Sequence, residues 1–213
     1  MDYAKLLKIA ANHKFIDNDT LAELFVVNGL REVYDDKTFK KNKVLQMLKL
    51  IEGRAINRNN QKIAGAVYDE LSALSPGSMA PDFSLFDNEN KLYHLNDFTK
   101  GPLLMCFWSA GSNASLRQLS FLSEYHEKYS DQITVIGICI DDNWAKAEKH
   151  LNGLQAKWLN LYKDRQYDVT DKYRVYSVPT YVLINAKAEI VKYPASGPED
   201  GLEGEINRLF SEK

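Results

Sequence analysis

One stretch decides the fold, namely Leu103-Leu104-Met105-Cys106-Phe107-Trp108-Ser109-Ala110-Gly111-Ser112-Asn113-Ala114-Ser115-Leu116-Arg117. Its first six residues are apolar and predict a buried strand. A short polar turn follows, and residues 115–129 carry apolar side chains at the spacing of an amphipathic helix. A turn that opens a helix presents its side chains beside the free N–H groups of the first helical turn. Ser112 and Ser115, three positions apart, are therefore the polar pair to explain.

Composition limits the classes of function. The 213 residues are 45% hydrophobic, which is enough for one large or two small domains. The formal net charge of −2 predicts no nucleic-acid partner. The N-terminus lacks a basic segment followed by an apolar stretch, so we expect no signal peptide and no membrane span in this chain.

Two cysteines, Cys106 and Cys139, lie in apolar runs that resemble central strands. We expect both to be reduced, buried and inert, because a buried cysteine behaves as a small hydrophobic residue. A structural disulfide or a reactive thiol is the alternative. We expect neither a metal nor a cofactor.

The first part of the chain is expected to be helical. All six prolines lie at or beyond residue 76, so residues 1–76 form one predicted segment and 77–213 a second. A capping box, Thr20-x-x-Glu23, is predicted to open one of four helices. Their apolar stripes are expected to pack against each other or against the next domain. The stripes are Tyr3, Leu6, Leu7, Ala10 and Ala11; Leu21, Leu24, Phe25, Leu30 and Val33; Leu45, Leu48 and Ile51; and Ile63, Val67, Leu71 and Leu74.

The second part alternates strands and helices. A hairpin is predicted around the turn at 87–90. Further strands are expected at 103–108, 133–140, 158–161, 180–184 and 189–192, and helices at 115–129, 144–152, 167–173 and 200–211. This order predicts an α/β fold with parallel strands, then an antiparallel hairpin and a closing helix.

That order resembles the thioredoxin fold, a central mixed sheet flanked by helices. Five features in the correct order are similar to the TlpA/ResA-like, redoxin-type branch of the thiol–disulfide oxidoreductases. They are Pro81-Asp82-Phe83, Phe107-Trp108, the inserted helix after Ile140, Asp164-Arg165-Gln166 and Val178-Pro179-Thr180. The helical segment before Pro81 is similar to members from Bacteroidetes. The resemblance implies an extracytoplasmic, periplasmic location within a longer exported precursor; the alternative is a cytoplasmic location.

The resemblance also implies roles for single residues. Ser112 takes the place of the nucleophilic cysteine and Ser115 that of the resolving cysteine. Pro179 takes the place of the cis-proline that faces them, and Asp142 falls where relatives carry an acidic residue near the active site. Asp142 is alternatively a strand-end or helix-cap residue. In the family, substrate backbone pairs with the residue before that proline, here Val178.

The chain departs from the family pattern at the chemistry itself. Both cysteines are absent, and so are the aromatic residue usual at Gly111 and the prolines usual at Ala114 and Ser120. Because the thiolate performs the redox chemistry, Ser112 and Ser115 leave no catalytic residue to expect. Several losses together favour natural degeneration over an engineered pair of Cys→Ser changes.

The leading hypothesis is a redox-inactive thioredoxin-like module, structural or polypeptide-binding, within a larger exported protein. Its peptide groove comprises Gly111, Ser112, Val178 and Pro179. The alternative is a thiol–disulfide oxidoreductase whose two cysteines were replaced by serine. A serine hydrolase needs a general base, and no histidine adjoins the turn in sequence. The histidines are His13, His94, His126 and His150.

Overall fold

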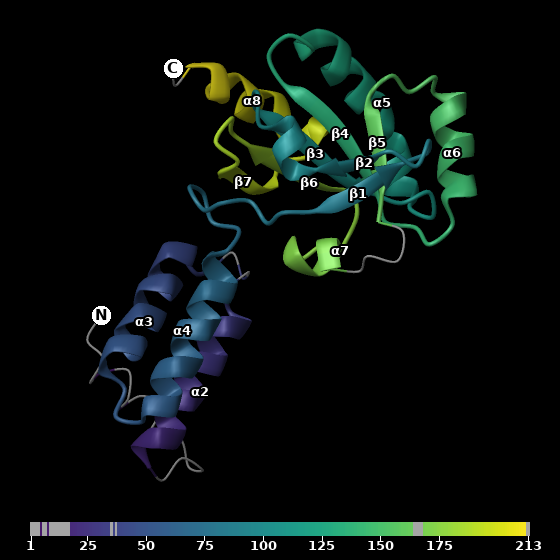
Figure 1. The fold of residues 1–213 in the computed structure, drawn as a ribbon. Coiled ribbons are helices and arrows are strands. Elements are labelled where there is room, and N and C mark those ends of the chain that lie inside the picture. Colours follow the sequence, from purple (N-terminus) through teal and green to yellow (C-terminus); the bar gives the residue numbers. More distant parts are fainter. Residues whose placement is uncertain are drawn as a thin grey trace. The chain divides into compact units, whose positions relative to one another are not determined.

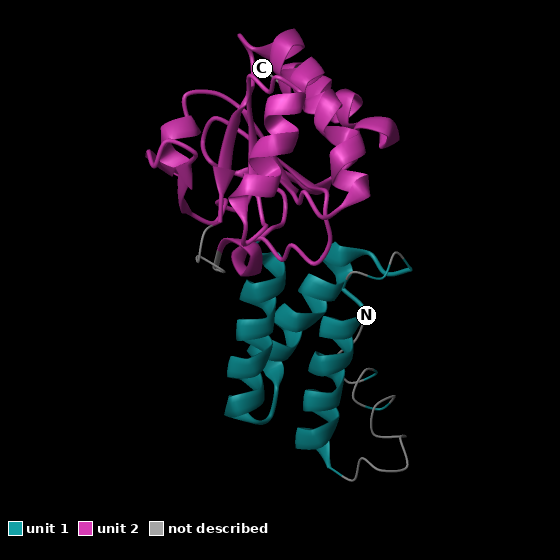
Figure 2. Cartoon of the chain, turned by 90° about the vertical axis from the view of Figure 1, so that its right-hand side faces the viewer, with its two compact units in different colours: residues 1–73 teal, residues 74–213 magenta. Residues whose placement is uncertain are grey.

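The computed structural model describes residues 5, 8, 18–34, 36, 38–163 and 168–211. The chain forms two compact units, Met1–Ala73 and Leu74–Lys213 (Figure 2). The stripe predicted as a first helix, from Tyr3 to Ala11, lies outside the described residues, as does the motif Asp164-Arg165-Gln166.

Three described helices build the first unit: α2 (Asp19–Glu32), α3 (Lys41–Arg54) and α4 (Arg58–Ser72) (Figure 1). Their shared core includes Val27, Leu48 and Val67. Leu21, Phe25 and Ile63 were expected inside this core, but they are 45%, 51% and 37% exposed. The expectation was wrong because α2 and α4 carry apolar side chains on more than one face, and packing among the three helices covers only one of them.

The predicted capping box at the start of α2 is also wrong. Asn18 is the N-cap, and its Oδ1 accepts a hydrogen bond from the Leu21 N–H at 2.9 Å. Glu23 is fully buried and turned toward α4. Its Oε1 accepts from the Ile56 N–H at 2.6 Å, and its Oε2 accepts from the Asn60 amide at 2.9 Å. The carboxylate of one helix thus satisfies donors at the start of another.

Replacing Glu23 with alanine is expected to lower the free energy of unfolding of the first unit by about 3 kcal/mol, because three donors lose their acceptor: the Ile56 and Asn57 N–H groups and the buried Asn60 amide. Glu32→Ala, at the exposed end of the same helix, is the matched control and is expected to change it by less than about 0.5 kcal/mol. Urea unfolding of the full chain, followed by circular dichroism, measures both variants. Equal effects would show that Glu23 is not needed for this packing.

The second unit is built on a seven-stranded mixed sheet in the order β2-β1-β5-β4-β3-β6-β7 (Figure 1). Strands β3, β4 and β5 run parallel, and the remaining pairs are antiparallel. The strands are β1 (Ser84–Asp87), β2 (Leu92–His94), β3 (Leu103–Trp108), β4 (Thr134–Cys139), β5 (Leu159–Tyr162), β6 (Thr180–Ile184) and β7 (Ile190–Ala195). The predicted α/β architecture with helices at the N-terminus is confirmed.

Helices cover both faces of this sheet. They are η1 (Leu95–Phe98), α5 (Asn113–Tyr129), α6 (Trp144–Gly153), α7 (Asp168–Lys172), η2 (Pro198–Asp200) and α8 (Leu202–Ser211). Strand β3 is buried along its whole length. Its odd-numbered side chains pack with residues of η1 and α7, and its even-numbered ones with residues of α5, α6 and α8. This alternation follows from the two-residue period of a strand.

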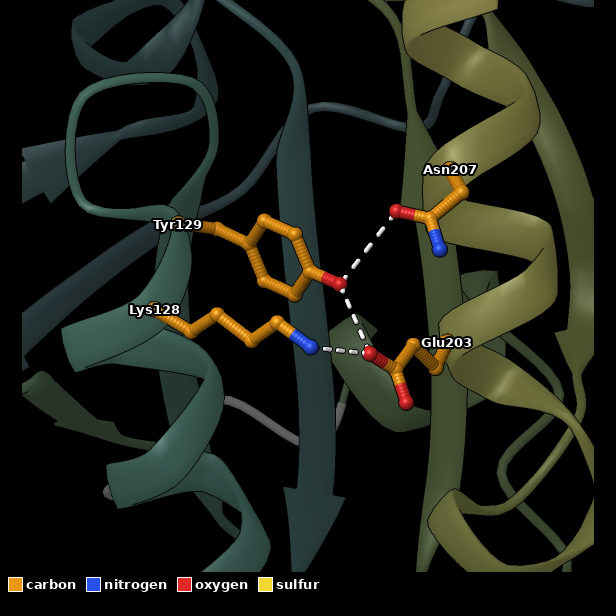
Figure 3. A network of polar contacts seen from close by, with 4 residues as sticks. All are labelled: Lys128, Tyr129, Glu203 and Asn207. Carbon is orange, nitrogen blue, oxygen red and sulfur yellow. Dashed lines mark hydrogen bonds and ion pairs between the residues drawn. The ribbon is translucent and has the colours of Figure 1, made fainter.

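A polar network joins the end of α5 to α8 (Figure 3). The Tyr129 hydroxyl donates a hydrogen bond to Glu203 at 3.0 Å and lies 3.3 Å from Asn207 Oδ1. Lys128 forms an ion pair with the same carboxylate. These contacts attach α8 to the C-terminal end of α5. They lie away from the turn at the start of α5.

Candidate functional site

The turn between β3 and α5 brings Ser112 and Ser115 together. Ser112 is the N-cap of α5, and its Oγ accepts a hydrogen bond from the Ser115 N–H at 3.2 Å. Ser115 is only 1% exposed, and its Oγ accepts from the Ser109 N–H at 3.4 Å. The helix begins two residues earlier than predicted because a serine at this position is a favourable N-cap.

The same turn meets the loop before β6. The Ser112 hydroxyl donates a hydrogen bond to the Val178 carbonyl at 3.3 Å, although 66 residues separate them. The Val178–Pro179 peptide bond is cis. Gly111 is exposed, whereas Ser112, Val178 and Pro179 are partly buried. These four residues are called the turn–loop surface below.

Two residues of this region were missed from the sequence, Ser109 and Asp141. The Asp141 carboxylate accepts hydrogen bonds from the Ser109 hydroxyl and from the Ala110 N–H, each at 2.6 Å. Ser109 directly follows β3, and Asp141 lies two residues after the end of β4, the parallel neighbour of β3. Polar residues at the carboxyl ends of adjacent parallel strands meet at one edge of the sheet, and this signal could have found them.

Asp142, the acidic residue expected near the turn, makes an ion pair with Lys163. Its side chain is 76% exposed, and its Oδ1 lies 3.4 Å from the Lys163 Nζ. Successive residues of an extended chain point to opposite sides, so the residue that shares the side of Cys139 is Asp141. The Cys139 thiol donates to Asp141 at 3.4 Å, in agreement with this alternation.

The described part of the chain supplies no histidine base for either serine. His94 Nδ1 lies 2.8 Å from the Ser84 hydroxyl, on the β1–β2 hairpin. No hydrogen bond joins a described histidine to Ser112 or Ser115. The described residues also contain no group of three or more acidic, histidine or cysteine side chains that could hold a metal ion.

Both cysteines are free and buried. Burial raises the pKa of the Cys106 thiol to about 12 and has the same effect on Cys139. Their strands are neighbours, but Cys106 is in register with Gly137 and Cys139 with Trp108. Both thiols are therefore protonated at neutral pH and lie away from the surface, which makes them poor nucleophiles.

We expect alkylation of the folded protein by iodoacetamide at pH 8 to be roughly a thousandfold slower than that of a free thiol, because so little thiolate is present. Urea should release both cysteines to react at the normal rate, and mass spectrometry counts the modified residues. Fast labelling of either cysteine in the folded state would contradict this expectation.

The buried thiols also make stability depend on pH. The folded thiols stay neutral, while those of the unfolded chain ionise near ~8.5. The free energy of unfolding should therefore fall as the pH rises from ~8.5 toward 12.

The similarity to a known protein family lies in the second unit of the chain. The model of the AhpC/TSA family matches residues 76–193, more than half of the sequence. This chain belongs to the AhpC/TSA family. The ResA-like resemblance is also confirmed. The thiol-disulfide oxidoreductase ResA of Geobacillus thermodenitrificans is 25% identical over 126 residues, which cover 59% of this chain and 72% of that protein. The Bacillus subtilis ResA is 24% identical over 132 residues, covering 61% and 73%.

Solved structures agree on the fold of this AhpC/TSA member. The thioredoxin domain of a thiol-disulfide oxidoreductase from Bacteroides vulgatus has a TM-score of 0.58 at 24% identity, covering 64% of this chain and 98% of that domain. The C-terminal domain of a protein from Bacteroides thetaiotaomicron with the same description has a TM-score of 0.58 at 22% identity, covering 66% and 99%. The predicted thioredoxin-like fold is thus confirmed. Among the described residues, no helix is long and apolar enough to cross a membrane.

Proposed function

We propose that this chain is a redox-inactive member of its family that binds an extended segment of polypeptide at the turn–loop surface. The observation that carries the proposal is the hydrogen bond from the Ser112 hydroxyl to the Val178 carbonyl, which brings the turn beside the loop backbone without any thiol. We also propose that it works as a module, with residues 77–213 as the thioredoxin-like domain, in a longer exported, extracytoplasmic protein.

The absence of redox activity follows from the chemistry of the side chains. Disulfide exchange needs attack by a thiolate and release of a second thiol. Serine hydroxyls at positions 112 and 115 supply neither. The two thiols of this chain are buried and protonated. The chain therefore offers no thiolate that could attack a disulfide of a bound polypeptide.

Polypeptide binding is supported by the backbone of the loop. In the part of the chain that the structure describes, the Val178 N–H donates no hydrogen bond. A carbonyl oxygen has two lone pairs, so the Val178 carbonyl retains one beyond the bond from Ser112. Tyr176, two residues earlier, is 85% exposed. A free N–H, a carbonyl with a remaining lone pair and a nearby exposed aromatic residue in the sequence suit the addition of an extended strand.

The test uses reduced, carboxymethylated α-lactalbumin, an extended polypeptide whose blocked thiols exclude covalent capture. Isothermal titration is expected to show weak, reversible binding to the full chain. Gly111→Trp should weaken this binding about tenfold, because the bulky ring occupies the exposed edge of the surface. Gly153→Trp, at the exposed end of α6, is the matched control and should bind like the unaltered chain with an unchanged Tm.

Three results would overturn the proposal. The first is the absence of binding by the unaltered chain, and the second is binding that Gly111→Trp leaves unchanged. The third is turnover above the dithiothreitol background in an insulin-reduction assay, abolished by Cys106→Ala. That outcome would make the buried Cys106 the nucleophile.

A further inference from the structure

The β3–α5 turn is held by four side-chain acceptors and one backbone carbonyl that lie within it or beside it. The backbone donors and their acceptors are Ser109 N–H to Ser115 Oγ at 3.4 Å, Ala110 N–H to Asp141 Oδ2 at 2.6 Å, Gly111 N–H to Ser109 Oγ at 3.0 Å, Ser112 N–H to the Ser109 carbonyl at 3.1 Å, and Ser115 N–H to Ser112 Oγ at 3.2 Å. Each of these N–H groups has a partner. The turn is therefore ordered without a thiol or a disulfide.

Asp141 is the member of this network that comes from another strand end. One of its oxygens accepts from the Ala110 N–H, and the other accepts from the Ser109 hydroxyl. The Ser109 hydroxyl in turn accepts from the Gly111 N–H. Asp141 therefore fixes Ala110 directly and Gly111 through Ser109. Hydrogen bonds to a carboxylate are shorter and stronger than those between neutral groups, which suits this residue to the task.

We propose that Asp141 is the positioning residue of the turn–loop surface. By holding residues 109–111, it sets where Gly111 lies and where the Ser112 hydroxyl meets Val178. This inference rests on the proposed function for its binding consequence, but its effect on the turn stands by itself. Asp141 does not contact the polypeptide; it acts through the shape of the turn.

Asp141→Asn tests this role directly, because it changes the number of acceptor atoms without changing the shape of the side chain. Both carboxylate oxygens accept, whereas an amide of the same shape has one oxygen and one donating nitrogen. In the variant, either the Ala110 N–H faces an N–H group, or the amide nitrogen faces the Ser109 hydroxyl, whose own proton then loses its carboxylate acceptor. Asp142→Asn is the matched control, because it makes the same substitution at the neighbouring residue that points away from the turn.

Amide hydrogen exchange read by NMR measures the turn directly. Asp141→Asn is expected to speed exchange at Ala110 and Gly111 roughly tenfold or more, while Asp142→Asn leaves both unchanged. Binding of carboxymethylated α-lactalbumin should weaken about tenfold in the first variant and not in the second. Ser109→Ala should show the same two effects. Ser109→Thr keeps a hydroxyl, so its exchange rates and its affinity should lie close to those of the unaltered chain.

A control for stability separates positioning from simple weakening of the fold. Glu203→Gln removes the carboxylate that Lys128 and Tyr129 share at the far end of α5 (Figure 3). It is expected to lower the Tm while leaving the exchange of Ala110 and the polypeptide affinity unchanged. If Glu203→Gln weakens binding as much as Asp141→Asn at an equal loss of Tm, the positioning role is overturned.

The remaining outcomes are distinguishable. If the unaltered chain binds no polypeptide but Asp141→Asn still releases Ala110 and Gly111, the proposed function fails and Asp141 keeps its effect on the turn. If the unaltered chain binds and Asp141→Asn behaves like Asp142→Asn in both measurements, the inference about Asp141 is wrong and the proposed function stands.

Discussion

Replacing Ser112 and Ser115 together by cysteine is expected to give this chain disulfide reductase activity. The two positions lie at the N-cap and third residue of a 17-residue helix, with the Val178–Pro179 loop beside the first of them. A helix N-terminus lowers the pKa of a thiol from ~8.5 to as little as ~3.5–7.5. The thiolate fraction of Ser112→Cys at pH 7 should then rise from a few per cent to roughly a quarter or more.

The assay is dithiothreitol-driven reduction of insulin, with the unaltered chain at the reductant background. Ser112→Cys alone should form mixed disulfides without turnover, because no second thiol releases the product. Ser115→Cys alone should stay unreactive, because position 115 is buried. A folded double variant that neither forms the 112–115 disulfide nor turns over would show that the turn no longer supports family chemistry. Turnover would show that the turn still supports disulfide exchange and that the serine side chains at positions 112 and 115 prevent it in the unaltered chain.

A large loss of stability is expected for Gly137→Ala, in the middle of β4. A Cβ atom at this position would lie 2.3 Å from Asn160 Oδ1, 3.0 Å from Trp108 Nε1 and 3.2 Å from Trp158 Nε1. Both indole rings are buried, and the Asn160 amide is held by the Trp158 carbonyl at 3.1 Å. All three groups are buried, so we expect the added methyl group to overpack the core.

We expect Gly137→Ala to lower the free energy of unfolding of the second unit by about 3 kcal/mol, or its Tm by roughly 10 °C. Gly204→Ala is the matched control. It lies in α8 with nothing within 4 Å of its added Cβ, and it should stabilise the protein by up to ~1 kcal/mol. Calorimetry measures both. Adding Asn160→Ala should relieve part of the loss, and a double variant whose loss is the plain sum of the two would contradict the proposed clash.

Much of the fold could be predicted because it rests on local patterns. The apolar run Leu103–Trp108 predicts a strand buried on both faces, and the structure has it inside the sheet, between β4 and β6. The order of strands and helices predicts parallel pairing next to an antiparallel hairpin, which agrees with the observed sheet. These predictions hold because side-chain periodicity and chain connectivity leave few arrangements that bury the apolar faces.

The errors share one physical cause, which is that a local pattern does not specify its distant partner. Thr20-x-x-Glu23 matches a capping box, but the buried Glu23 serves backbone donors 33 and 34 residues away. Leu21 and Phe25 have helical spacing, yet packing among the helices selects a different face of α2. Which donors and which faces meet depends on how the helices are arranged.

For this protein, the sequence by itself determined the fold family, the strand and helix that flank the turn, and the serines at positions 112 and 115. Each of these depends on residue type and short-range order along the chain. Only the tertiary structure decided that Asp141, and not Asp142, holds the turn, and that the Ser112 hydroxyl reaches Val178. The physical reason is that hydrogen bonds depend on ångström-scale distances and on direction, which arise only when the sheet register brings separate strand ends together.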